Sequence, residues 1–176
     1  NNTATGSASF ATGNTTFATG NIATSMGEDT RATGGFSMAV NHSTIASGDN
    51  SFAANDGAVA SGSISSSFGY NTKSKSYGGF VLGTYNDSTN ATDGAGYNAT
   101  NRAFQIGNGT ADVARSNAMT ILFNGKTGIG TTAPVSLLTV EQGIYGKRGL
   151  RLSGLPTGVG TKALRIDASG NVTQAD

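Results

Sequence analysis

The stretch that decides the fold is GFSMAVNHSTIASGDNSFAANDGAVASG, residues 35–62. It divides into two 14-residue units, and each unit divides into two seven-residue halves, which end at Asn41, Gly48, Asn55 and Gly62. Gly and Asn tolerate the left-handed backbone better than most residues and are typical of the turns that end strands. The stretch therefore predicts short strands that alternate with tight turns, two strands to each 14-residue coil.

The seven-residue period extends far beyond this stretch. A helix with Gly at every seventh position would lose about 1 kcal/mol at each one relative to Ala, so a coiled coil is excluded. Stacked coils of a β-solenoid fit instead, because each coil is ordered by contacts with its neighbours. The positions that keep the period are Gly6, Gly13, Gly20, Gly27, Gly34, Asn41, Gly48, Asn55, Gly62, Gly69, Ser76 and Gly83.

The composition supports a repeat fold and narrows the function. Leu, Ile, Val and Phe, eight of each, make up about 18% of the 176 residues, which is low for an ordinary globular core. The absence of Cys and the single His exclude a disulfide framework, a Cys-based zinc site and a His-rich metal site within one chain, and no cofactor is expected. A net charge of +1 argues against nucleic acid as the main partner. No apolar run has the length of a membrane helix. The chain opens without Met or a signal peptide and is interpreted as a piece of a longer protein.

Side-chain size assigns the two faces of each strand. In the first half of each unit a small residue stands between larger apolar ones, as in Met38-Ala39-Val40, and alternate residues of a strand point to opposite faces. The second half again centres on Ala or Ser. We expect the small residues to fill a thin coil interior, which leaves the large face as an apolar stripe without a partner in its own chain. Such a stripe is typical of an interface, and identical chains around an axis would bury it. The alternative is a thicker monomeric coil with Phe and Met inside and Ala outside.

The units 35–48 and 49–62, together with NRAFQIG at 101–107, resemble the 14-residue repeat of the YadA-like head of trimeric autotransporter adhesins. The resemblance covers roughly residues 1–110. It implies an all-β, left-handed parallel β-roll whose three chains pack their inner strands around a trimer axis. Lys73 and Lys75 depart from the repeat. The residues then expected at the trimer axis are Phe10, Met26, Met38, Val40, Phe52, Phe68, Phe80, Leu82, Phe104 and Ile106.

The period breaks after Gly83 and returns at Gly107. We interpret residues 84–100 as an insertion or one distorted coil with a protruding loop. Loops carry function more often than scaffolds do, so this segment is either a ligand-contact site or a phase-correcting insert. The candidate contact residues are Asn86, Asp87, Asn90, Asp93 and Tyr97.

Residues 111–176 have a different pattern and predict a short β-rich neck or stalk. SNAMTILFNGKTGIG (116–130) predicts a hairpin with an Asn-Gly turn, and SLLTV (136–140) a strand. LRLSGLPTGVG (150–160) predicts a strand followed by a loop, and ALRIDASGNVTQ (163–174) a second hairpin with its turn at 169–170. RSNAMTILFNGKTGIGTTAP (115–134) also resembles a linker common in bacterial surface fibres and phage tail fibres.

The side chains do not predict catalysis. Glu28, Asp49 and Asp56 follow strand turns and are interpreted as solvated acids, not as the carboxylate pair of a glycosidase. His42 is the one imidazole, and no G-x-S-x-G motif occurs. A basic cluster is either a solvated face or a contact for an anionic glycan; it comprises Lys147, Arg148, Arg151, Lys162 and Arg165.

Together these features predict a non-catalytic segment of an extracellular fibre, located on a cell surface or in a virion tail. Its expected partners are two copies of itself and a host or environmental surface, such as a glycan. It would act in adhesion or as a rigid spacer, and a phage receptor-binding segment is the nearest alternative. Two weaker alternatives are a tailspike depolymerase and an ice-binding solenoid. The second is suggested by Thr12, Thr19 and Thr33.

Overall fold

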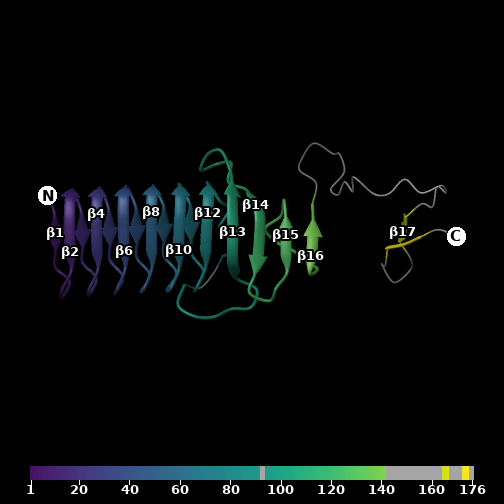
Figure 1. Ribbon diagram of the computed structural model, residues 1–176, viewed down its shortest axis with the longest axis horizontal. Helices are drawn as coiled ribbons and strands as arrows, with labels where there is room; N and C mark the ends of the chain where they lie inside the picture. Colours follow the sequence, from purple (N-terminus) through teal and green to yellow (C-terminus); the bar gives the residue numbers. More distant parts are fainter. Residues whose placement is uncertain (92–93, 142–163, 167–171, 175–176) are drawn as a thin grey trace.

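The computed structural model describes residues 1–91, 94–141, 164–166 and 172–174. All regular structure in these ranges is β-sheet, and no helix occurs in them. Figure 1 shows the long strands as a row of stacked arrows that starts at the N-terminus. The all-β solenoid predicted from the repeat is thereby confirmed.

Each coil contributes one five-residue strand and one two-residue strand. Equivalent strands of successive coils pair in parallel with an offset of 14 residues, as in Ala39 with Ala53 and Ala46 with Ala60. The long strands are β2 (Phe10–Asn14), β4 (Thr24–Glu28), β6 (Met38–His42), β8 (Phe52–Asp56), β10 (Ser66–Tyr70) and β12 (Phe80–Thr84). The short strands are β1 (Thr3–Ala4), β3 (Phe17–Ala18), β5 (Arg31–Ala32), β7 (Ile45–Ala46), β9 (Val59–Ala60) and β11 (Lys73–Ser74).

The coil interior contains small side chains. Ala39, Ala46, Ala53 and Ala60 have no exposed surface, whereas Phe52 lies half-buried on the outer side of its strand. The predicted face assignment is therefore confirmed, and the alternative with Phe and Met inside the coil is wrong.

Buried hydroxyl groups in this interior hydrogen-bond across the coil. The Ser25 and Thr30 hydroxyls lie 2.7 Å apart, and the Ser67 hydroxyl donates to Thr72 Oγ1 at 2.9 Å. Because a buried hydroxyl without a partner is costly, these pairs allow Ser and Thr to replace Ala without loss of packing.

Two rows of Gly follow the seven-residue period for different physical reasons. Gly27 has a φ of 123°, and Asn41 follows it in the same row with a φ of 83°, so the predicted left-handed turn is confirmed there. Gly34 is not left-handed. A Cβ atom on Gly34 would lie 2.0 Å from the carbonyl oxygen of Gly48 in the next coil, so this row requires Gly for close backbone contact.

A further left-handed row carries large side chains and was not predicted. Ile22, Phe36 and Ile64 have φ values of 53°, 56° and 60°, and all three side chains are exposed. Such φ values are unusual for large and β-branched residues. Asn50 and Gly78 stand at the same corner in two other coils, which is too few to mark it in the sequence. At Ile22, Phe36 and Ile64 the coil geometry imposes the conformation instead.

The insertion begins later than the sequence indicated. β13 (Arg102–Asn108) pairs in parallel with β12, and Phe104 stands beside Phe80, so this coil has 24 residues in place of 14. Asn86 stands 14 residues after Thr72, at the equivalent position of the next coil, and both residues are buried. The regular period therefore continues to Asn86, and the ten additional residues come after it.

The long sheet continues beyond the parallel coils. β14 (Asn117–Leu122) pairs antiparallel with β13, β15 (Thr127–Ile129) antiparallel with β14, and β16 (Leu138–Val140) parallel with β15. The first predicted hairpin is confirmed, but its loop is one residue longer than expected. Leu122 N donates to Lys126 O, so residues 123–125 form the loop, with Gly125 in the left-handed conformation.

A third sheet, with two strands, holds the last predicted hairpin. β17 (Leu164–Ile166) and β18 (Val172–Gln174) pair antiparallel, which confirms the two strands. The expected turn at 169–170 and the strand expected within 150–160 lie outside the described residues.

The close contact between coils gives a direct test of this geometry. Gly34→Ala should lower the melting temperature markedly, because its Cβ would enter the space of the Gly48 backbone carbonyl in the next coil. Gly96→Ala is the matched control, since a Cβ there meets nothing within 4 Å. Replacing an unstrained Gly by Ala typically stabilises a protein by about 0.4–1 kcal/mol. Thermal unfolding followed by circular dichroism compares the two variants; equal melting temperatures would contradict the proposed role of Gly34.

Candidate functional site

A continuous apolar stripe follows the outer face of the long sheet. Its Phe side chains contact one another from coil to coil: ring centroids lie 5.0 Å apart for Phe52 and Phe68, 5.5 Å for Phe68 and Phe80, and 5.9 Å for the stacked pair Phe80 and Phe104. Phe10 is 54% exposed and Leu82 36%. The structure thus places the ten predicted axis residues in two adjacent rows of one sheet face, namely Phe10, Met38, Phe52, Phe80 and Phe104, and Met26, Val40, Phe68, Leu82 and Ile106.

The stripe extends beyond the residues that the repeat identified. Met119 pairs with Ile106 and Ile121 with Phe104, so both side chains share the stripe's face. Ile129 continues it on β15, and Val140 lies beside Ile129 on β16. Ten strands spaced about 4.8 Å apart give a stripe roughly 43 Å long. The 14-residue repeat does not predict this extension of the stripe, because β14 and β15 beyond β13 pair antiparallel and no longer follow the repeat.

A polar row borders the stripe at the ends of the long strands. Asn14 Nδ2 donates to Glu28 Oε1 at 3.1 Å, and the His42 imidazole Nδ1 lies 2.8 Å from Asp56 Oδ1. The hydrogen bond that the protonated imidazole donates to the Asp56 carboxylate raises the pKa of His42 above its ordinary value of 6.5, against a smaller opposing effect of desolvation. This border marks the limit of the apolar surface on one side.

The raised pKa of His42 predicts a pH dependence. Because the folded-state pKa exceeds the unfolded value, the pair contributes stability that is fully present below about pH 6.5 and is lost as pH rises through the folded pKa. His42 is the only His in the chain, so its imidazole signals in an NMR titration are unambiguous. We expect a midpoint above 6.5 and a lower one in Asp56→Asn. Asp49→Asn, which removes the same charge elsewhere, should leave the midpoint unchanged; a wild-type midpoint at or below 6.5 would refute the pairing.

The candidate contact residues of the insertion do not form one site. Asn86 is fully buried, so its prediction as a ligand contact is wrong. Its side chain accepts from Lys73 N at 2.7 Å and donates to Lys73 O at 3.0 Å, which continues the short-strand pairing at the end of the coils. Asp87 is half-buried, and its carboxylate accepts from Thr89 N at 2.7 Å.

The other three candidates lie differently. Asn90 is exposed and lines a pocket described below. Tyr97 is 65% exposed, and its ring packs edge-on against Phe123 with centroids 5.4 Å apart. Asp93 lies outside the described residues.

Polar side chains close the end of the thin coil interior. Gln105 takes the inner position that Val81 holds in the preceding coil and is fully buried. Its Nε2 donates to Asp87 O at 2.8 Å, and Asn86 Nδ2 donates to Gln105 Oε1 at 3.3 Å. Arg115 adds hydrogen bonds to the carbonyl groups of Asn71 and Asn86. This network fixes the start of the insertion.

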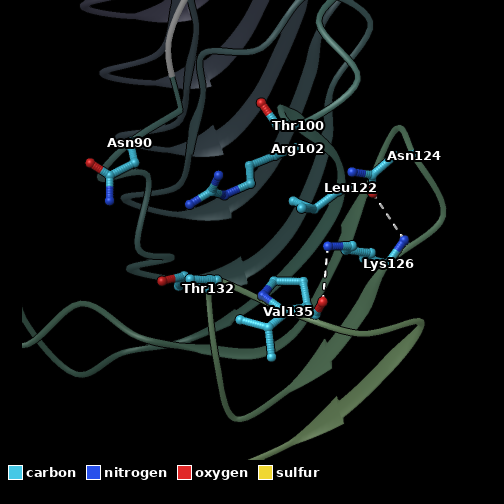
Figure 2. A pocket seen from close by; sticks show the side chains of 10 residues that line it. Asn90, Thr100, Arg102, Leu122, Asn124, Lys126, Thr132 and Val135 are labelled. Atoms are coloured by element: carbon cyan, nitrogen blue, oxygen red, sulfur yellow. Dashed lines mark hydrogen bonds between the residues drawn. The ribbon is translucent and has the colours of Figure 1, made fainter.

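A pocket of about 540 Å³ lies where the insertion meets the neck. Figure 2 shows Arg102 and Lys126 extending into the same space, Arg102 from β13 and Lys126 from its position between the hairpin loop and β15. Lys126 Nζ donates to Val135 O at 2.9 Å. The lining residues are Asn90, Thr100, Arg102, Leu122, Asn124, Lys126, Thr132, Ala133, Pro134 and Val135. The thin coils admit mainly small side chains, and this pocket lies outside them, at the junction.

An irregularity in strand pairing places Arg102 in this pocket. Arg102 pairs with Leu122 but Phe104 with Ile121, so the register shifts between Arg102 and Phe104. Without the shift, Arg102 and Phe104 would share a face, since they stand two residues apart. The shift moves Arg102 to the face of Leu122, opposite the apolar stripe. No periodic sequence signal marks such a bulge, and sequence reasoning missed the pocket.

Within the described ranges there is no group of three or more His, Asp or Glu side chains that could hold a metal ion. Of the basic cluster, Lys147, Arg148, Arg151 and Lys162 lie outside the described residues, and Arg165 belongs to β17. In the part of the chain that is described, no helix has the length and apolar character needed to cross a membrane.

Comparisons with family models, with curated proteins and with solved structures find no match for this chain.

Proposed function

We propose that this chain is a segment of a homotrimeric extracellular fibre that holds or presents contact surfaces away from a cell or virion. The observation that carries the proposal is the apolar stripe, which runs along ten strands and has no partner among the residues that the structure describes. Large exposed apolar patches are rare on monomeric proteins and mark interaction surfaces. Every copy of the chain carries the same stripe, so identical copies can bury their stripes against one another.

The shape of the stripe favours an axis shared by three chains. It is two residues wide along each strand, or roughly 7 Å, with the His42 and Asp56 row on one side. Two flat sheets packed face to face would bury a wider surface and would place this polar row in the interface. Three copies that meet along a narrow stripe leave the row at the rim, where the charged groups stay hydrated.

The outer surface supports adhesion or spacing by shallow contacts. The short-strand face carries exposed Thr19, Thr33, Ser47 and Ser61, and the Arg31 guanidinium lies 4.9 Å from the centre of the Phe17 ring. Three copies of a weak contact on one fibre raise the overall avidity by multivalency. We propose no catalytic role, because the described pocket contains basic, amide, hydroxyl and apolar side chains and no carboxylate pair.

A charge placed in the stripe tests the assembly. Phe52→Asp would bury three unpaired carboxylates at the axis, which costs several kcal/mol for each one. We expect this variant to lose the trimer in sedimentation-velocity experiments at micromolar concentration. Thr33→Asp adds the same charge to the exposed outer face and should remain trimeric. If both variants sediment as the wild type does, the stripe is not the assembly interface.

A further inference from the structure

Arg102 is a buried cation whose hydrogen-bonding capacity is only partly used. Its side chain is 6% exposed, and its Nη2 donates to Thr89 O at 3.0 Å. The Nε group is buried and has no hydrogen-bond partner among the described residues. Burial lowers the pKa of the guanidinium, with an opposing effect of Asp87. A buried donor without an acceptor is costly, so this N–H group indicates a site that an acceptor from outside the chain can complete.

The surroundings of Arg102 favour an anionic ligand. Lys126 contributes a second positive charge to the pocket, and its contact with Val135 O uses one of three ammonium protons. Among the described residues, no carboxylate lines the pocket. Asp87 has an electrostatic effect on Arg102, but its side chain is already hydrogen-bonded to Thr89 N.

The remaining lining suits a molecule larger than a simple ion. The volume of about 540 Å³ lies within the range of small-molecule sites, about 300–1,000 Å³. Leu122, Pro134 and Val135 offer apolar surface for the C–H face of a sugar ring. Amide and hydroxyl groups for its hydroxyls come from Asn90, Thr100, Asn124 and Thr132.

We propose that this pocket binds a carboxylate-bearing sugar of the uronic acid class, with the carboxylate against Arg102. A guanidinium presents a planar fork of N–H donors that matches the two oxygens of a carboxylate. Lys126 supplies the second charge, and the apolar and amide groups hold the ring. The proposal deepens the adhesive role and rests on it for its biological purpose, whereas the pocket itself is built by one chain.

The pocket remains open in the proposed trimer. Arg102 lies on the face of the sheet opposite the stripe because of the register shift before Phe104. Burial of the stripe at the axis therefore leaves the pocket on the outside of the fibre, once in each chain. Three equivalent sites would give multivalent binding to an acidic polysaccharide.

Isothermal titration of the full 176-residue protein with glucuronic acid tests the proposal. We expect saturable binding that glucose does not reproduce. Lys126→Gln should weaken it at least about tenfold, a change of about 1.4 kcal/mol in binding free energy. Arg102→Gln should weaken it further, and Lys126→Gln keeps the test valid if Arg102→Gln does not fold. Arg31→Gln, which removes an exposed charge from the short-strand face, should bind as the wild type does.

Three results would overturn the proposal. The first is that the folded wild type does not bind glucuronic acid, and the second is that Lys126→Gln binds it as tightly as the wild type does. The third is that sulfate binds as tightly as glucuronic acid, which would indicate a simple anion site. The sedimentation of each sample is measured separately. A monomeric protein that binds glucuronic acid would refute the trimer and support the binding pocket. A trimer that does not bind glucuronic acid would support the assembly and refute the binding pocket.

Discussion

The close approach of successive coils is the constraint on which the rest of this structure depends. At Gly34 the backbones come so near that a single Cβ would lie 2.0 Å from a neighbouring carbonyl oxygen. A coil this thin has room inside for small side chains such as Ala, Ser and Thr, and the larger Val81 and Gln105 take the inner position only in the last two coils of the parallel stack. The hydrophobic effect therefore cannot stabilise the coils through a conventional core. Backbone pairing, small-residue packing and hydroxyl pairs such as Ser25 with Thr30 hold each coil on the next.

The same constraint explains why the large apolar residues lie outside. Phe52 and Phe80 have no space inward, so they form the stripe, and in the proposed trimer other copies of the chain bury it. The proposed binding pocket lies where the constraint is relaxed. The ten additional residues after Asn86 and the bulge before Phe104 interrupt the regular coils, and the pocket around Arg102 forms at that interruption.

The sequence predicted the regular part of the molecule because each coil repeats the same physical requirement. Gly or Asn at the turns and Ala39 between Met38 and Val40 are enough to derive the period, the strands and both faces. The irregular part could not be predicted in the same way. Asn86 looks like a loop residue in the sequence, yet it continues a buried row. Arg102 reaches the pocket only through a register shift, and Ile22 adopts a left-handed backbone that its own preference opposes.

Methionine oxidation tests the central claim most directly, namely that identical chains bury the stripe. The chain has three Met residues, and Met26, Met38 and Met119 all lie on the stripe. In a single chain Met26 is 39% and Met38 37% exposed, which leaves both thioethers open to peroxide. Peptide mass spectrometry after brief peroxide treatment should show all three protected in the native protein and oxidised after unfolding. Oxidation of Met26 and Met38 in the folded protein at the rate of the unfolded chain would contradict the account.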